Sequence, residues 1–246
     1  MVNKKVEFVG LVSGHGTSLL PLTNYLKKEM YPILNKPFLE YTLENVRQLT
    51  DRVIIVLGPH SEQIQKYFGS EWKNLKIDYI HQVDPRGTAD AVYKVFNKFG
   101  METAIFWFGD TYIPKSLFVK FLESPRDNLM AYKKVDFIPK APIEIDSFGC
   151  VTCVVDCHSG YAGTGLVKLN RSVIDYFKMF QKENRLRFII RDAIDDGHKF
   201  FGVEADEWIH MGILEGGNIR DNPVEHRNCF KEIVDYFYEK EQKQCL

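Results

Sequence analysis

The chain has 246 residues, of which 45% are hydrophobic, so it is long enough to bury the core of one large domain. Its 32 Lys and Arg residues nearly balance its 33 Asp and Glu residues, which argues against attraction to nucleic acid or to an anionic membrane surface. The first residues lack the apolar core of a signal peptide and no apolar run is long enough to span a bilayer, so a cytoplasmic protein is expected.

The first half of the chain alternates apolar strands with helices. Apolar runs predict buried strands at residues 6–12, 53–57, 76–81 and 104–108. Apolar residues at helical spacing, with Ser61 as the cap of the second helix, predict helices at residues 38–49, 61–68 and 88–99. This rhythm is typical of a parallel sheet with helices on both faces, whose ligands bind at the carboxyl ends of the strands.

The second half is less regular. The pattern predicts a strand at 129–133, two antiparallel hairpin arms at 148–156 and 161–169, a helix at 172–183, a short strand at 200–203 and a terminal helix at 230–241. No linker rich in Pro, Gly or Ser divides the chain, so residues 1–246 are expected to form one domain. The predicted fold class is α/β: a three-layer, Rossmann-like, mixed and mostly parallel sheet flanked by helices, with a β-hairpin insertion.

A glycine-rich turn follows the first predicted strand. It contains Gly14, His15, Gly16 and Thr17. Successive backbone N–H groups in such a turn can point outward together and bind phosphate without a side chain. Lys28 follows and can supply a cation. These residues predict a nucleotide-phosphate site, in which His15 either touches phosphate or is simply exposed.

Two polar residues follow later strands of the predicted sheet. Gln82 comes after the strand at 76–81, and Asp110 comes after the strand at 104–108. Because the carboxyl ends of parallel strands meet at one edge, both residues are expected to converge with the glycine turn. The alternatives are a polar strand end for Gln82 and a helix cap for Asp110.

The cysteines leave a second kind of site open. Cys150, Cys153, Cys157 and His158 have a spacing that could hold zinc. However, residues three apart on a strand face opposite sides, so Cys150 and Cys153 would diverge. Reduced cysteines in the core and at a strand edge are therefore favoured over zinc.

Further motifs follow the glycine turn in a fixed order. They are Pro21-Leu22-Thr23, Lys28, Asn35-Lys36-Pro37, Gln82 with Gly87-Thr88-Ala89, Gly109-Asp110, Phe148-Gly149, 161–165 and 208–212. With them the chain resembles the sugar-phosphate nucleotidylyltransferases, the NDP-sugar pyrophosphorylases of the glucose-1-phosphate thymidylyltransferase type. The first 115 residues carry most of this resemblance.

The resemblance implies a reaction between a nucleoside triphosphate and a sugar 1-phosphate that gives an NDP-sugar and pyrophosphate. It implies these roles: triphosphate binding by Gly14, His15, Gly16 and Thr17, catalysis by Lys28, base recognition by Gln82, Gly87 and Thr88, and sugar binding by Gly149 and Gly165. Residues 1–115 would bind the nucleotide, for which a pyrimidine is favoured, and residues 116–246 would bind the sugar and carry the terminal helix. Asp110 and His210 would hold Mg²⁺, with Mn²⁺ as the alternative because it tolerates a histidine ligand. A homo-oligomer is left open.

The chain also departs from the family pattern. It has Ser18 where the family has an arginine, Lys27 where it has a proline, and His210 where it has an aspartate, and it lacks the family's E-K-P segment between Asp156 and Tyr161. Lys27 is expected to lie in solvent, with a return of some positive charge to the loop as the alternative. Asp206 or Glu207 is considered as a substitute for the missing aspartate. These departures favour a weakened or altered enzyme. The alternatives are a catalytically impaired nucleotide- or nucleotide-sugar-binding homologue that acts as a regulatory or partner subunit and, more remotely, a glycosyltransferase.

Overall fold

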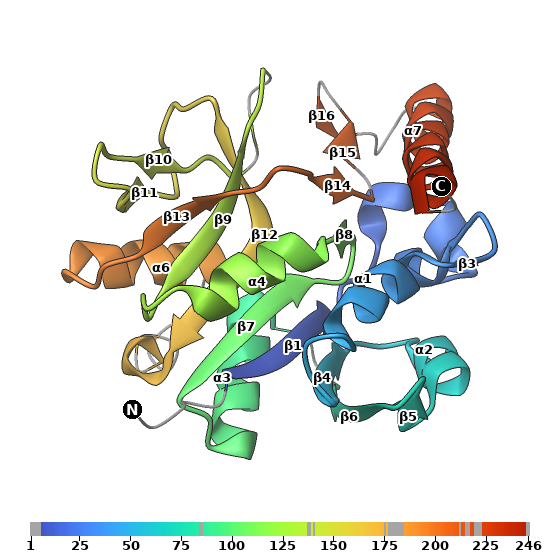
Figure 1. The fold of residues 1–246 in the computed structure, drawn as a ribbon, viewed down its shortest axis with the longest axis horizontal. Coiled ribbons are helices and arrows are strands. Elements are labelled where there is room, and N and C mark those ends of the chain that lie inside the picture. The colour runs from blue at the N-terminus through green and yellow to red at the C-terminus, as the bar shows by residue number, and fades with distance from the viewer. Residues whose placement is uncertain are drawn as a thin grey trace.

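A computed structural model describes residues 6–83, 86–136, 139, 141–174, 176, 185–211, 213–214, 217–218 and 223–244. Its central sheet has eight strands: β1 (Val6–Val12), β4 (Arg52–Leu57), β5 (Glu71–Trp72), β6 (Leu75–His81), β7 (Thr103–Phe108), β9 (Leu129–Lys134), β12 (Tyr161–Asn170) and β13 (Phe201–Glu204). They lie in the order β13-β9-β12-β7-β1-β4-β6-β5 (Figure 1).

Most neighbours in this sheet are parallel. β1 runs parallel to β4 and β7, β4 runs parallel to β6, and β13 runs parallel to β9. β12 is antiparallel to both β7 and β9, and β5 is antiparallel to β6. The expected α/β fold with a mixed, mostly parallel sheet is therefore confirmed.

Helices cover both faces of the sheet (Figure 1). The α-helices are α1 (Phe38–Val46), α2 (Glu62–Phe68), α3 (Thr88–Phe99), α4 (Lys115–Glu123), α6 (Leu186–Asp195) and α7 (Pro223–Gln244). Short 3-10 helices are η1 (Thr17–Leu19), η2 (Leu22–Asn24), η3 (Lys28–Met30) and η4 (Arg171–Val173). Small two-stranded sheets pair β2 (Pro32–Ile33) with β3 (Lys36–Pro37), β8 (Thr111–Tyr112) with β14 (Ile209–His210), β10 (Glu144–Ile145) with β11 (Val151–Cys153), and β15 (Ile213–Leu214) with β16 (Gly217–Asn218).

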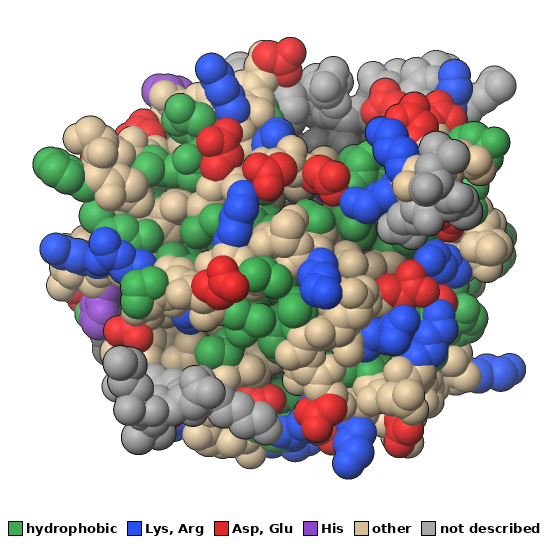
Figure 2. Space-filling view, viewed as in Figure 1, with side chains coloured by type: hydrophobic (Ala, Val, Ile, Leu, Met, Phe, Trp, Pro, Cys, Tyr) green, Lys and Arg blue, Asp and Glu red, His purple; other side chains and the backbone are tan. Residues whose placement is uncertain are grey.

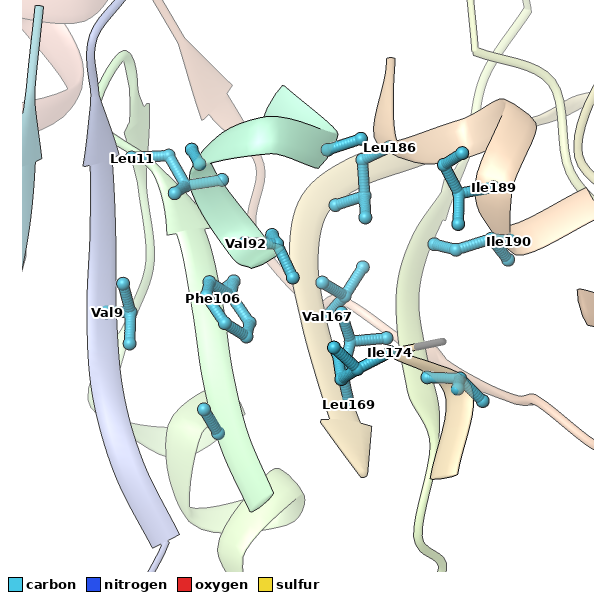
Figure 3. Packing of buried hydrophobic residues seen from close by; sticks show 14 of the residues in the cluster. Val9, Leu11, Val92, Phe106, Val167, Leu169, Ile174, Leu186, Ile189 and Ile190 are labelled. Carbon is cyan, nitrogen blue, oxygen red and sulfur yellow. The ribbon is translucent and has the colours of Figure 1, made fainter. Parts of the chain in front are cut away.

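The strand period of two divides the core between the two faces. Val9 and Leu11 of β1 belong to the buried cluster that includes side chains of α3 and α6 (Figure 3). Phe8 and Val12 of the same strand belong to a second cluster, which includes side chains of α1, α2 and α4. Burial on both faces explains why the central strands are nearly continuous apolar runs.

The C-terminal helix α7 packs away from the central sheet. Phe237 is 1% exposed, and its ring stacks on Tyr41 of α1 at a centroid distance of 3.8 Å. Tyr112 of β8 contacts the same ring edge-on at 5.1 Å. Because β8 pairs with β14, this packing also supports the segment that carries His210.

The structure corrects several predicted elements. The predicted pairing of 148–156 with 161–169 is wrong, since β11 pairs with β10 while β12 inserts into the large sheet between β7 and β9. Both sides of β12 are thus taken by long-range partners. Helix α6 was not expected, and α7 starts before the predicted residue 230. Of the predicted helix 172–183, residues 175 and 177–183 lie outside the described residues.

Among the helices that the structure describes, none combines the length and the apolar character that a membrane crossing requires. Figure 2 shows one face of the molecule, on which basic and acidic side chains lie interspersed. This distribution agrees with the near balance of charge in the sequence.

Candidate functional site

A cavity of about 230 Å³ opens where β1 and β7 end side by side. It is lined by Leu11, Ser13, Gly14 and His15 at the end of β1, Phe108 and Asp110 at the end of β7, Lys28 and Glu29 of η3, and Gly87 and Thr88 at the start of α3. Most of the residues that the sequence singled out for phosphate and base binding thus meet at one place. This place is the carboxyl edge of the parallel strands, where such sheets bind ligands.

Two side chains tie down carbonyl groups of the glycine loop, residues 13–17. Lys27 donates from Nζ to the carbonyl oxygen of Gly14 at 2.7 Å, and Thr23 donates from Oγ1 to that of Gly16 at 2.8 Å. Gly16 has a positive φ of 71°, and a Cβ there would lie 2.8 Å from Thr23 Cγ2. Glycine at position 16 therefore serves both the turn and the close contact with Thr23.

The amide groups of the same loop are left available. Within the described residues, the N–H groups of Gly14, His15 and Thr17 donate no hydrogen bond. In a planar trans peptide the N–H points opposite to the preceding carbonyl, so the His15 and Thr17 amides face away from the side chains of Lys27 and Thr23. This arrangement suits an anion that accepts several backbone hydrogen bonds at once.

The start of α3 contributes polar groups to another side of the cavity, through Gly87 and Thr88. Gly87 has a φ of 101° and precedes the first turn of this 12-residue helix, whose N–H groups carry partial positive charge. The amide of Leu186 donates to Thr88 Oγ1 at 2.8 Å, which ties α6 to the same corner. Gln82 is 1% exposed and donates from Nε2 to Asp90 at 2.8 Å and to the Gly87 carbonyl at 3.4 Å. Gln82 thus braces the Gly87 turn, and direct contact of Gln82 with a base stays a prediction.

Lys28, Asp110 and His210 form the charged centre of the site. Lys28 Nζ donates a hydrogen bond to Asp110 Oδ2, and His210 Nε2 lies 3.4 Å from the same oxygen. Burial disfavours the Asp110 carboxylate, but His210 and Lys28 outweigh burial and hold the pKa of Asp110 below its ordinary value. Burial likewise opposes the charge on Lys28, yet Asp110 and Glu29 raise its pKa. Helix α4 begins at Lys115 after Pro114, so Asp110 does not cap it.

Glu29 is a second carboxyl group on this cavity. It is 1% exposed, and its Oε2 has no hydrogen-bond partner among the described residues. Its stem passes the end of β7, because Glu29 Cγ lies 3.2 Å from where a Cβ on Gly109 would sit. Burial raises the pKa of Glu29; Lys28 opposes this increase, and Asp110 adds a smaller one. The site therefore holds one carboxyl group in an ion pair, that of Asp110, and a second, that of Glu29, with one oxygen that has no hydrogen-bond partner among the described residues.

The pairing of β14 with β8 places His210 opposite Thr111, next to Asp110. The two acidic residues considered as substitutes for the missing aspartate are engaged elsewhere. Asp206 bonds to Lys120 at 2.9 Å, and Glu207 accepts hydrogen bonds from Tyr236 and Lys240 of α7. Both residues have partners away from Asp110, so the suggestion that one of them replaces the family's aspartate is wrong.

The two glycines expected to face a sugar lie in different settings. Gly165 has a φ of 86° at the irregular part of β12, and a Cβ there would lie 2.9 Å from Phe108 Cδ2. Since Phe108 lines the cavity, Gly165 lies next to it. Gly149 has a φ of 79° and lies between β10 and β11, where its carbonyl accepts from Gly202 at 2.9 Å. It is not among the residues that line the cavity.

The cysteine cluster is only partly assembled. Cys153 and Cys157 lie close enough for their thiols to interact, and burial and this contact raise the pKa of Cys157 to about 12. Over the described part of the chain, no three His, Cys, Asp or Glu side chains are grouped so that they alone could hold a metal ion. This holds for the cysteines and for the Asp110 region alike.

Two residues of the site were missed or misjudged from the sequence. Lys27 is 7% exposed, so the expectation that it lies in solvent is wrong. Its ammonium group is drawn inward by the Gly14 carbonyl, a partner that adjacent sequence does not reveal. Glu29 was not considered, because a glutamate between Lys28 and Met30 carries no signal of burial.

Comparison with known proteins gives a consistent result. Residues 9–212 match a protein family described as "Nucleotidyl transferase". The chain is 27% identical over 245 residues to a D-glycero-alpha-D-manno-heptose 1-phosphate guanylyltransferase of Aneurinibacillus thermoaerophilus, a match that covers 94% of this chain and 100% of that protein. It is 26% identical over 225 residues to the bifunctional protein GlmU of Methanococcus maripaludis, and this match covers 84% of the chain but only 51% of that longer protein.

A solved structure has the same fold. The structure of a putative glucose-1-phosphate thymidylyltransferase from Bacillus anthracis superposes with a TM-score of 0.74 and 17% identity, over 94% of this chain and 96% of that one. Its likeness concerns the arrangement of strands and helices. The match therefore supports the α/β architecture described above.

Proposed function

This chain belongs to the nucleotidyl transferase family, and we propose that it transfers a nucleotidyl group from a nucleoside triphosphate to a sugar 1-phosphate. The observation that carries the proposal is the cavity that joins the free amides of the glycine loop to Lys28 and Asp110. Amides, an ammonium group and a carboxylate are the groups that bind and neutralise a transferring phosphoryl centre. The full-length heptose 1-phosphate guanylyltransferase relative is named for a reaction of this class.

The reaction needs positioning and charge neutralisation more than covalent chemistry. An oxygen of the sugar phosphate forms a new bond to the α-phosphorus of the triphosphate. The bond from that phosphorus to the oxygen bridging to the β-phosphorus breaks, and pyrophosphate leaves with the electron pair. In this proposal the amides of Gly14, His15, Gly16 and Thr17 hold the triphosphate, and Lys28 turns from Asp110 to the reacting phosphates.

The residues around Asp110 fit a divalent cation. Mg²⁺ is usually held by one or two carboxylates together with substrate phosphate oxygens, so a complete cage of protein ligands is not required. Asp110 supplies one carboxylate, and Glu29, whose Oε2 has no hydrogen-bond partner among the described residues, brings a second carboxyl group to the lining of the same cavity. His210 is a nitrogen ligand that suits Mn²⁺ better than Mg²⁺. When bound, such a cation would neutralise charge on the triphosphate.

We further propose that residues 1–115 bind the nucleotide and residues 116–246 bind the sugar. Support for this division is that Gly87 and Thr88 line the cavity, where they would contact the base. Gly165 lies next to Phe108, which lines the same cavity and would adjoin the sugar. The base is either a pyrimidine, as the sequence suggested, or guanine, as the name of the heptose 1-phosphate guanylyltransferase suggests for this class. The experiment below separates them.

The test measures pyrophosphate release by the purified protein. Each of GTP, UTP, CTP, ATP and dTTP is combined with a panel of aldose 1-phosphates in the presence of Mg²⁺ or Mn²⁺. The proposal expects release with one base and one sugar phosphate, and none with Asp110→Asn. Saturable triphosphate binding without release in any combination would contradict the transferase and favour the binding homologue. No triphosphate binding at all would contradict both.

A further inference from the structure

Lys27 contacts the glycine loop although its side chain does not line the cavity. Its Nζ lies 2.7 Å from the carbonyl oxygen of Gly14, and the residue is 7% exposed. Its own backbone is held on both sides: the Lys27 amide donates to Gln63 Oε1 at 3.2 Å, and the Lys27 carbonyl accepts from Met30 at 2.9 Å. The ammonium group is therefore delivered to the loop from a fixed segment.

The contact sets the direction of one peptide group. With the Gly14 carbonyl bound to Lys27, the His15 N–H of the same trans peptide points the other way. Gly14 and His15 both line the cavity and Lys27 does not, so the amide faces the ligand side. A cation on the carbonyl also polarises the peptide and makes its N–H a stronger donor.

We propose that Lys27 is a positioning residue of the triphosphate site, which orients the Gly14–His15 peptide toward the phosphates and adds a second positive charge next to Lys28. This inference rests on the proposed function. It also bears on a departure in the sequence, because position 18 holds a serine where the resembling family has an arginine. Lys27 restores positive charge to the loop from the opposite side of the peptide.

A purely structural role would not need this charge. Removing a lysine from water for one backbone carbonyl is costly, and an apolar side chain of similar length would fill the same space. Burial lowers the pKa of Lys27, and Lys28 adds to this effect, while the carboxylates of Glu29 and Glu62 favour the charged ammonium group. Gln63 already holds the neighbouring backbone, since its side chain bonds to both the Lys27 amide and the Tyr25 carbonyl. Since Gln63 holds the backbone, the ammonium group of Lys27 is not needed for that purpose, and its hydrogen bond to the Gly14 carbonyl is the contact that it contributes.

The test compares Lys27→Met, Lys27→Arg and the control Lys66→Met, which alters an exposed lysine on α2. Calorimetry measures binding of inorganic tripolyphosphate, as a probe without a base, and of GTP and UTP. Lys27→Met is expected to weaken tripolyphosphate and the preferred triphosphate about 10–100-fold, the effect of losing one charge-assisted hydrogen bond. Lys27→Arg should retain most of the affinity, Lys66→Met all of it, and the thermal unfolding midpoint of Lys27→Met should stay near that of the wild type.

The outcomes separate the inference from its premise. Wild-type affinity in Lys27→Met would overturn the role of Lys27 while leaving the proposed function intact. Two results would show that Lys27 acts only through packing. One is an equal loss of affinity in Lys27→Met and Lys27→Arg; the other is a loss of affinity together with a lowered unfolding midpoint in both variants. If the wild type bound neither tripolyphosphate nor any triphosphate, the proposed function and this inference would fall together.

Discussion

Lys28 and Asp110 form an ion pair across 82 residues of sequence, with the lysine ammonium donating to Asp110 Oδ2. Their side chains are only 12% and 13% exposed, so each charge depends on the other in the absence of ligand. A triphosphate would contact the positive charge of Lys28, and its cation would contact the negative charge of Asp110. Binding can therefore replace this ion pair by a contact of Lys28 with phosphate and a contact of Asp110 with the cation.

Replacing Lys28 with methionine tests both sides of this pair. The rate of pyrophosphate release should fall by about 10²–10³-fold, because the ammonium no longer stabilises charge on the phosphates. The free energy of unfolding should fall by about 3–5 kcal/mol, because buried Asp110 loses the ammonium group that donates a hydrogen bond to it. Denaturant unfolding and initial rates measure the two effects. The double variant Lys28→Met/Asp110→Asn should recover stability but not activity, and full stability of the single variant would contradict the pairing.

Glu29→Gln tests the second carboxyl group. The amide keeps the size of the side chain but is a poor ligand for a hard cation. Affinity for Mg²⁺ or Mn²⁺, measured by calorimetry or by Mn²⁺ resonance with the triphosphate bound, should fall at least about tenfold. Asp78→Asn is a suitable control, since that carboxylate of β6 pairs with Arg52 and does not line the cavity. Unchanged cation affinity in Glu29→Gln would remove Glu29 from the cation site.

Gly58 follows β4 and lies against the backbone of Ser13, at the start of the glycine loop. This close approach leaves no room for a side chain at position 58. A Cβ at this position would lie 2.3 Å from the Ser13 carbonyl oxygen and 2.9 Å from Ser13 Cα. Gly58→Ala therefore must displace backbone of the loop, and a shift of about 1 Å can cost up to about 10²-fold in rate. Steady-state rates measure the loss. Gly160→Ala is the control, because its nearest contact would be ordinary at 3.5 Å, and equal behaviour of both variants would refute the argument.

The sequence revealed those parts of the site that depend on local pattern. The glycine turn after β1, the Gly87 turn before α3, and Asp110 after β7 are each marked by a short motif next to a strand or helix, and the sheet brings them to one edge. Strands 6–12 and 76–81 and helix 88–99 were predicted nearly to the residue. Apolar period and glycine position were sufficient for these elements.

What the sequence could not reveal depends on distant partners. The burial of Lys27 depends on the Gly14 carbonyl, and that of Glu29 depends on how η3 packs against the end of β7. The place of β12 was misjudged because alternation over 161–169 fits a hairpin arm as well as a strand between β7 and β9. Long-range pairing, rather than local preference, decided each of these cases.

Glu207 gives α7 a pH-sensitive contact with the segment that leads to His210. Burial opposes its charge, but hydrogen bonds from Tyr236 and Lys240 outweigh burial and hold the pKa of Glu207 below its ordinary value of 4.5. A carboxyl group with a lowered folded-state pKa stabilises the fold above its unfolded pKa, and this contribution disappears as the pH falls through the folded value. The unfolding midpoint of the wild type should therefore exceed that of Glu207→Gln at neutral pH and converge with it below pH 4.5. A difference that persists unchanged in acid would contradict this account.

Ser18→Arg tests whether the departure at the glycine loop limits catalysis. A guanidinium at this position would offer fixed paired donors to the leaving pyrophosphate, which a serine hydroxyl cannot match. Pyrophosphate release with the preferred substrates should rise by up to about 10²-fold, the effect of adding one well-placed donor in an electrostatic site. Ser18→Lys serves as the comparison: a single ammonium carries the charge without the planar fork, so its gain should be smaller. If both variants bind triphosphate but neither releases pyrophosphate faster than the wild type, the positive charge at the loop does not limit catalysis. The absence of the E-K-P segment before Tyr161 would then be the departure that limits the rate.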